Sequence, residues 1–277
     1  MTARQARGAG PGDAVRIGAD RTYRLAIRLF GTLFRVMGYR FDVRGVEHIP
    51  TDGPAVVAGN HIGFLDFTFV GYAARPRGRH IRFMAKRSVF ELPVVGRLMR
   101  AMHHVPVDRM HGASAYRRAL RLLDAGQVVG VFPEATISRS WLLKPFRRGA
   151  AGLAVSRGVP LVPAVVWGGH RILTVDGHRT LRRGMPVTII VGEPLHAAPG
   201  ESVDELSARL HLRMEELLAE AIDGYPDTPR DEHDRWWLPH DRGGSAPDVD
   251  TAAALDREAV ARIGDAFEAD PRAKETS

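Results

Sequence analysis

The chain has 277 residues and an ordinary globular composition, 44% hydrophobic and 26% charged, with a formal net charge of +7. This length suits one or two domains and is ample for a hydrophobic core. The chain contains no cysteine, which excludes disulfides, thiolate metal sites and a cysteine nucleophile.

Positive charge is concentrated in the first part of the chain. Residues 1–44 contain nine arginines against three aspartates, whereas residues 226–277 contain seven basic and thirteen acidic residues. The positive charge of residues 1–44 and of the middle of the chain suits an anionic partner, such as a phosphate-bearing substrate or an anionic membrane. No nucleic-acid-binding motif is present, and the few aromatic residues are not interleaved with the basic ones, so we expect no nucleic-acid partner.

The N-terminal region divides into two segments. Residues 1–20 are rich in Gly, Ala and Arg and are expected to be disordered; they lack the apolar core of a secretory signal. Residues 21–40 have the pattern of an amphipathic, membrane-associating helix. Its broad apolar arc lies opposite a narrow stripe formed by Arg21, Arg24, Arg28 and Arg35.

Such a helix suits an anionic membrane surface, with arginine at the phosphates and leucine and phenylalanine among the acyl chains. Packing of the helix on its own domain is the alternative, and the width of the apolar arc favours both roles at once. No apolar run approaches the roughly 20 residues needed to span a bilayer. We therefore expect a peripheral protein on the cytoplasmic side of the cell membrane.

Residues 41–225 alternate between strand and helix patterns. This alternation predicts one α/β domain with a central, largely parallel mixed sheet flanked by helices and preceded by the N-terminal amphipathic helix. We expect strands at 55–58, 82–85, 105–107, 128–132, 161–166 and 187–191. We expect helices at 66–74, 94–102, 113–125, 149–156 and 203–222.

The end of the domain is marked by a helix signal and a change of composition. Ser202, with Glu205 three residues later, predicts a capping box for the last of these helices. Residues 226–277 are an acidic C-terminal tail that Trp236 and Trp237 are expected to fasten to the domain, with a short helix at 255–267.

His61 and Asp66 follow the first buried strand and form a candidate general-base unit. The imidazole can take a proton near neutral pH, and the carboxylate can fix its tautomer. In a straight helix residues five apart lie about 140° apart. The pair is therefore expected across a loop-to-helix junction, where Gly63 permits the turn. A surface histidine near a helix-capping aspartate is the alternative for the isolated motif.

Three further stretches lie at or near predicted strands. Val107-Asp108-Arg109 ends one strand with an arginine suited to a bidentate grip on phosphate. Residues 128–140 run from a buried strand directly into Pro133-Glu134 and several hydroxyl side chains. The proline-bracketed strand at 159–164 is architectural rather than chemical.

Other catalytic motifs are missing. The sequence contains no Gly-x-Ser-x-Gly elbow, Walker loop, dinucleotide fingerprint or His-Glu-x-x-His. His103, His104 and His111 have no partner at metal-ligand spacing, so we expect no metal and a solvated His103–His104 pair.

Together the four stretches resemble, in order and spacing, the four blocks of the glycerolipid acyltransferase family, which includes lysophosphatidic acid acyltransferases. His61 with Asp66 matches its His-x4-Asp block, and Val107–Arg109 the second block. Phe132-Pro133-Glu134 resembles the third block and residues 159–163 the fourth. The resemblance covers about residues 40–195.

The resemblance implies a role for each matching residue. His61 would be the general base and Asp66 its orienter, Arg109 would bind the acceptor's phosphate, and Glu134 would shape or bind the acceptor site. Lys86 would lie near the phosphate or the thioester. The third block departs from the family's Phe-Pro-Glu-Gly-Thr-Arg-Ser: Ala135 replaces the glycine and Ile137 the arginine, while Thr136 and Ser138 remain. Arg139 is expected to supply the missing charge.

The expected reaction is direct acyl transfer from acyl-CoA or acyl carrier protein to the hydroxyl of a lysophospholipid, foremost lysophosphatidic acid to phosphatidic acid. A thioester is already activated, so no further cofactor is expected. Another lysolipid, an aminolipid or a glycolipid is the alternative acceptor. Alternatives of other classes are a non-catalytic lipid-binding membrane protein and a lipid hydrolase that activates water.

Overall fold

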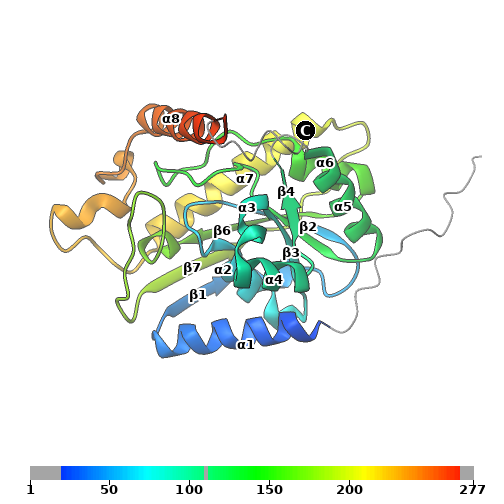
Figure 1. Cartoon of the computed structure of the whole chain (residues 1–277), viewed down its shortest axis with the longest axis horizontal. Coiled ribbons are helices and arrows are strands. Elements are labelled where there is room, and N and C mark those ends of the chain that lie inside the picture. The colour runs from blue at the N-terminus through cyan, green and yellow to red at the C-terminus, as the bar shows by residue number, and fades with distance from the viewer. Residues whose placement is uncertain (1–19, 109–111, 269–277) are drawn as a thin grey trace, which may run out of the picture.

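The computed structural model describes residues 20–108 and 112–268, in which a seven-stranded sheet lies between layers of helices (Figure 1). The strands are β1 (Arg40–Arg44), β2 (Ala55–Gly59), β3 (Ile81–Lys86), β4 (Val105–Val107), β5 (Val128–Val131), β6 (Leu161–Trp167) and β7 (Pro186–Val191). The helices are α1 (Arg21–Val36), α2 (Asp66–Ala73), α3 (Arg87–Glu91), α4 (Pro93–Ala101), α5 (Gly112–Asp124), α6 (Gly149–Arg157), α7 (Val203–Asp223) and α8 (Val249–Glu268).

The sheet has the strand order β1-β7-β6-β2-β5-β3-β4. All neighbouring pairs are parallel except β6 and β7, which are antiparallel. The predicted fold class, a largely parallel mixed sheet flanked by helices, is therefore confirmed. Strand β1 was not expected; its sequence alternates charged with apolar residues, as suits an edge strand with one face exposed.

The N-terminal helix is shorter than predicted because the chain turns at Gly38, which has a φ of 65°. A positive φ ends a helix readily at glycine, and the following residues can then enter β1. Asp20 precedes the helix and accepts hydrogen bonds from Arg82 at 2.6 Å and pairs with His80 at 2.8 Å. Asp20 is therefore fixed to the domain, whereas residues 1–19 lie outside the described part of the chain.

The two faces of the sheet bury separate cores, because successive side chains of a strand point to opposite faces. Val57 on β2 and Val162 on β6 belong to the core that also contains Phe69 of α2. Val56 and Leu161, one position away on the same strands, pack in the core formed with α5, α6 and α7.

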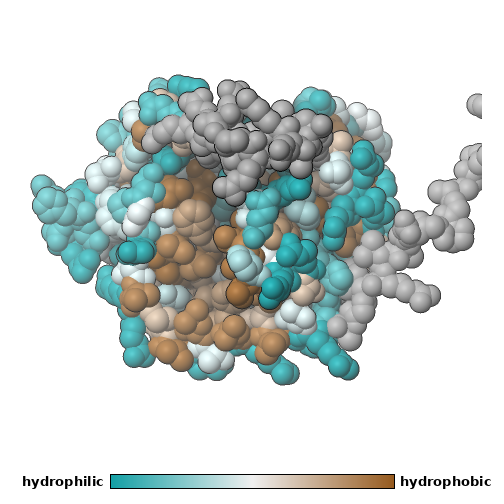
Figure 2. Space-filling view, viewed as in Figure 1, coloured by the Kyte–Doolittle hydropathy of each residue, from teal (hydrophilic) through white to brown (hydrophobic). Residues whose placement is uncertain are grey.

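The apolar arc of α1 is divided between the domain and the exterior. Tyr23, Ala26 and Phe34 are buried, and the Tyr23 hydroxyl donates to the backbone carbonyl of Ile81 at 2.8 Å. The outer part of the arc is exposed: Leu25 by 66%, Leu29 by 65%, Leu33 by 49% and Val36 by 58%. Figure 2 shows hydrophobic surface along the lower edge of the molecule, where α1 lies in Figure 1.

The last part of the chain packs against the domain. The predicted capping box is present at the start of α7, where Ser202 and Glu205 exchange side-chain to backbone hydrogen bonds. Trp237 is 1% exposed, and the indole N–H of Trp141 donates to the carbonyl of Trp236 at 2.8 Å, so the tryptophan pair does fasten this segment. Among the described residues, no helix has the length and hydrophobicity to cross a membrane.

Candidate active site

The parallel strands β2, β5, β3 and β4 bring four of the singled-out stretches to one edge of the sheet. His61 follows β2 and Glu134 follows β5, its parallel neighbour. Lys86 ends β3 and pairs in register with Val107 of β4. In such sheets ligands bind beyond the carboxyl ends of the strands, and this edge is therefore the candidate active site. Arg109 lies outside the described residues.

His61 and Asp66 meet across a loop-to-helix junction. The His61 Nδ1 atom lies 3.1 Å from Oδ2 of Asp66, the first residue of α2. The same oxygen accepts the backbone N–H groups of Ile62 and Gly63, both at 2.8 Å. A carboxylate accepts only, so Nδ1 carries the proton and Nε2 is left with its lone pair. The His61 side chain is 23% exposed, whereas that of Asp66 is fully buried.

Gly63 serves this junction by its small size and not by an unusual backbone angle. Its φ lies outside the left-handed region, so the turn expected from the sequence forms without a positive φ. A Cβ atom at this position would lie 3.1 Å from the Leu173 carbonyl oxygen and 3.2 Å from the His170 Cα. Both neighbours are backbone atoms, so a side chain at this position would be crowded.

The backbone of His61 is held on both sides. Its N–H donates to Glu134 Oε1 at 2.8 Å, and its carbonyl accepts the Ser138 N–H at 2.8 Å. The imidazole ring stacks on Phe132 with a centroid distance of 4.5 Å. The preceding Asn60 is buried, and its side-chain amide exchanges two hydrogen bonds with the Val166 backbone, which fixes the end of β2 against β6. The His61 imidazole is therefore held in place through its backbone and its ring.

Glu134 is a brace between two segments of the site. Its second oxygen, Oε2, accepts the backbone N–H of Lys144 at 3.1 Å. Burial raises the pKa of Glu134 to about 8, although the N–H groups of His61 and Lys144 act in the opposite direction. Both carboxylate oxygens of Glu134 accept backbone N–H groups, so the side chain connects the His61 and Lys144 segments.

The residues after Glu134 explain part of the departure from the family pattern. Ala135 has a φ of 64°, the left-handed region in which the family's glycine is unstrained. Ile137 is buried, with 7% of its side chain exposed. Ser138 is fully buried and its hydroxyl bonds to Ser140 at 3.1 Å, so the substrate contact expected for Ser138 is not supported. Its backbone instead supports His61.

Two cations lie beside this segment. Arg139 binds Asp176 through two nitrogens, at 2.8 and 3.1 Å, and also pairs with Asp256 of α8. Lys144 Nζ donates to the Thr136 hydroxyl and pairs with Asp256 at 2.6 Å. Lys144 and Asp256 were not singled out from the sequence, because residues 112 positions apart give no local signal of contact.

The two neighbouring histidines at the end of α4 do not form a solvated pair. His104 is 1% exposed, and its Nδ1 accepts the backbone N–H of Phe83 at 2.9 Å. Burial, with the nearby Arg82 charge, lowers the pKa of His104 to about 3. The prediction of a solvated pair was wrong, because Tyr23 of α1 and Phe83 of β3 cover the ring. Within residues 20–108 and 112–268, no group of three or more metal-binding side chains is present.

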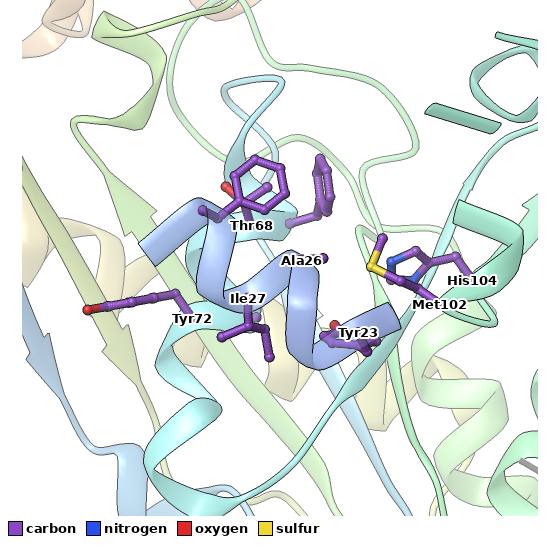
Figure 3. A pocket seen from close by; sticks show the side chains of 10 residues that line it. Tyr23, Ala26, Ile27, Thr68, Tyr72, Met102 and His104 are labelled. Carbon is purple, nitrogen blue, oxygen red and sulfur yellow. The ribbon is translucent and has the colours of Figure 1, made fainter. Parts of the chain in front are cut away.

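An apolar pocket lies between α1 and α2, close to the start of α2 (Figure 3). Its wall near Asp66 is formed by Phe67 and Thr68, the next residues of α2. The remaining lining residues are Tyr23, Ala26, Ile27, Phe30, Gly71, Tyr72, Met102 and His104. A lining of this composition suits a hydrocarbon chain.

A mixed α/β sheet with a His-x4-Asp unit at its carboxyl edge defines an acyltransferase-type domain, and comparison with known proteins agrees. A family model described as Acyltransferase matches residues 40–167. The chain is 32% identical over 178 residues to the 1-acyl-sn-glycerol-3-phosphate acyltransferase of Bacillus subtilis, a match covering 62% of this chain and 84% of that protein. The chain belongs to the glycerolipid acyltransferase family, as the sequence blocks predicted.

Two further similarities support this assignment. A chloroplastic 1-acyl-sn-glycerol-3-phosphate acyltransferase of Brassica napus is 33% identical over 167 residues, which are 59% of this chain and 47% of that protein. The chain thus spans about half the length of the plant relatives it matches. The crystal structure of the 1-acyl-sn-glycerophosphate acyltransferase of Thermotoga maritima shares the fold, with a TM-score of 0.61, 24% identity, and coverage of 74% of this chain and 81% of that one.

Proposed function

We propose that this protein transfers a fatty acyl chain from a thioester, acyl-CoA or acyl carrier protein, to the hydroxyl of a lysophospholipid. The observation that carries the proposal is the His61–Asp66 contact, which leaves Nε2 of a part-exposed imidazole free to accept a proton. Lysophosphatidic acid is the acceptor favoured by the names of the relatives. The product would then be phosphatidic acid.

In the proposed reaction His61 Nε2 takes the proton of the acceptor hydroxyl while the oxygen attacks the thioester carbonyl. The carbon–oxygen bond forms, the carbon–sulfur bond breaks, and the imidazolium returns its proton to the departing thiolate. Asp66 stabilises the imidazolium in between. General-base assistance of this kind contributes roughly 10²–10⁴-fold to the rate. Much of the remaining acceleration comes from positioning the two substrates.

The residues around the acceptor are assigned by their place at the sheet edge. Lys86 is exposed at the end of β3, beside the strand that leads to Arg109. Thr136 and Arg139 lie in the segment that follows Glu134, next to His61. We assign these residues to the acceptor's phosphate and the thioester, and Glu134 to the shape of the site.

The altered third block favours a second candidate, acyl transfer to a different lysolipid, aminolipid or glycolipid. Ile137 replaces the family's arginine and is buried. The charge at that point of the site therefore has to come from Arg139, which is already paired with Asp176. This change in charge predicts that the acceptor has a different headgroup, which the following experiment tests.

The test is an acceptor panel. Purified protein is incubated with labelled oleoyl-CoA, or the matching acyl carrier protein, and with lysophosphatidic acid, lysophosphatidylglycerol, an aminolipid and a glycolipid, and the products are resolved. Acylation of lysophosphatidic acid with the highest kcat/KM supports the proposal. Preference for another acceptor would change the proposed substrate but leave the proposed acyl-transfer reaction unchanged. Release of free fatty acid without any acceptor, or no thioester consumption at all, contradicts acyl transfer and supports a hydrolase or a lipid-binding protein.

We further propose that the protein lies peripherally on the cytoplasmic side of the cell membrane, held by α1. The exposed leucines of α1 supply apolar contact, and the arginines of the same helix supply attraction to anionic lipid headgroups. Phe64, within the His61–Asp66 junction, is also 50% exposed, which places apolar surface beside the site itself. Lipid substrates would then reach His61 from the bilayer.

A further inference from the structure

Helix α8 brings one carboxylate onto two cations of the site. Asp256 pairs with Arg139 through one oxygen and with Lys144 Nζ, at 2.6 Å, through the other. The three side chains are largely shielded, with exposed fractions of 15% for Arg139, 18% for Lys144 and 16% for Asp256. This geometry is that of a two-point anion site that is filled by a residue of the same chain.

One of the two cations, Lys144, is linked to His61 through a shared carboxylate. Glu134 accepts the Lys144 N–H with one oxygen and the His61 N–H with the other, so a single carboxylate joins the two backbones. Lys144 Nζ also binds the hydroxyl of Thr136, in the segment whose Ser138 N–H supports the His61 carbonyl. An anion held between Arg139 and Lys144 therefore lies next to the catalytic segment.

The helix that supplies Asp256 lies outside the residues that the family model matches. The family model ends at residue 167, whereas α8 begins at Val249. In Figure 1 α8 lies along the upper margin of the molecule, away from the sheet. Of its side chains up to Ala259, Ala252 is buried, at 3% exposed. The Asp256 ion pairs therefore connect this part of α8 to the segment that follows Glu134.

We propose that Arg139 and Lys144 form a binding site for the phosphate monoester of the acceptor, and that Asp256 occupies this site until the acceptor displaces it. Helix α8 is then an autoinhibitory strap lifted by the substrate. The proposal rests on the proposed function, because it places the headgroup beside His61. A phosphate monoester carries about −1.5 to −2 charges at pH 7 and three acceptor oxygens. It therefore outcompetes the single Asp256 carboxylate for Lys144 and Arg139, while Asp176 keeps its own pairing with Arg139.

The first test follows the position of α8 and needs no catalysis. The chain has no cysteine, so Ala252→Cys introduces a sole thiol that is protected while α8 is docked. Ala246→Cys is the matched control, since Ala246 is equally buried, at 3% exposed, but packs in the main core before α8 begins. Labelling by a thiol reagent is measured alone, with inorganic phosphate, with a short-chain lysophosphatidic acid and with its neutral monoacylglycerol counterpart.

We expect lysophosphatidic acid to accelerate labelling of the Ala252→Cys variant at least tenfold, and the neutral lipid to leave its labelling rate unchanged. Labelling of the Ala246→Cys variant should not change with either lipid. An equal response to inorganic phosphate assigns the recognition to the phosphate alone; a response to the lipid only assigns it to the phosphate together with its chain. Labelling that no phosphate compound accelerates overturns the proposal, even if the enzyme is active.

The second test is kinetic. Asp256→Asn keeps the shape of the side chain but removes its charge, and is expected to lower KM for the phosphate-bearing acceptor about tenfold without changing KM for a neutral one. Lys144→Met is expected to raise KM for the phosphate-bearing acceptor and to abolish the effect of Asp256→Asn in the double variant.

An equal loss of kcat for both acceptors in Asp256→Asn would mean that α8 is only a structural brace. If the protein transfers no acyl group but the thiol at position 252 still responds to phosphate, the proposed function fails and the anion site stands.

Discussion

Glu134 holds His61 from the neighbouring strand: its Oε1 atom accepts the His61 backbone N–H at 2.8 Å. The two residues follow β5 and β2, which are parallel neighbours, so the contact is a direct result of the sheet topology. With the Asp66 bond on the imidazole, His61 is fixed through both its backbone and its ring. The sheet therefore determines where the imidazole lies.

Glu134→Gln tests the brace. Above about pH 8, where Glu134 is ionised and has two acceptor oxygens, a glutamine has only one, so it leaves either the His61 or the Lys144 N–H facing an amide donor. We expect a loss of about 1–3 kcal/mol in the free energy of unfolding and a lower kcat. Glu216→Gln on α7 is the control, because Glu216 is 66% exposed in its side chain. Unchanged stability in Glu134→Gln would show that the two backbone bonds are not formed.

The same residue predicts a pH dependence of stability. The pKa of Glu134 is raised from its usual 4.5 to about 8, so between these values the folded protein keeps a proton that the unfolded chain has released. This group therefore makes the free energy of unfolding fall as pH rises from about 5 to 8, by up to about 1.4 kcal/mol per pH unit. Urea denaturation at pH 5, 6, 7 and 8 measures the slope, which Glu134→Gln should flatten; identical slopes in both proteins would contradict the raised pKa.

Asp66→Asn tests the orientation of the imidazole. The asparagine oxygen can still accept the Ile62 and Gly63 N–H groups, but it no longer stabilises the imidazolium that forms when His61 takes the proton. We expect kcat to fall about 10²–10⁴-fold, with little change in KM and an intact fold by circular dichroism. A fall in affinity alone, at unchanged kcat, would assign Asp66 to substrate binding instead.

Ala135→Gly tests the strain in the third block. A left-handed backbone costs a non-glycine residue roughly 1–2 kcal/mol, against about 0.5–1 kcal/mol for the extra chain entropy of glycine. Because Ala135 is exposed, little packing is lost, and we expect a net gain of about 0.5–1 kcal/mol in denaturant unfolding. Ala197→Gly is the control at an exposed position without positive φ, where a loss is expected. A loss at both positions would contradict the strain.

Leu29→Asp tests membrane attachment through α1. Leu29 is 65% exposed, so the change should leave the fold intact while removing apolar contact with the bilayer. We expect sedimentation with phosphatidylglycerol vesicles to fall at least tenfold, since burying a leucine contributes about 1.5–3 kcal/mol. Leu212→Asp on α7, 61% exposed and beside the other face of the sheet, is the matched control. Equal binding of all three proteins would exclude α1 as the anchor.

The sequence allowed the sheet to be predicted well because its strands are continuous apolar runs. Val128–Val131, for example, is buried at every position, and so is recognisable without knowing its partners. Strand β1 was missed because an edge strand with arginine at both ends has no such run. The His61–Asp66 junction was predictable since both residues are close in sequence and follow a buried strand.

The rest of the site depends on contacts that sequence patterns do not encode. Glu134 was singled out by its place after a strand, but its backbone partners His61 and Lys144 follow from the packing of β2 and β5. Ser138 was expected to contact substrate, yet burial turns its hydroxyl to Ser140. Asp256 lies in a helix beyond the residues that the family model matches, and its pairing with Lys144 is decided by tertiary structure alone.

The most direct test of the central claim is the acyl-transfer rate of His61→Ala, measured with the purified protein, saturating oleoyl-CoA and its preferred acceptor. Loss of the general base predicts a fall in kcat of at least about 10²-fold in a protein whose thermal unfolding matches the wild type. A His61→Ala variant that acylates the acceptor at near the wild-type rate would contradict the mechanism.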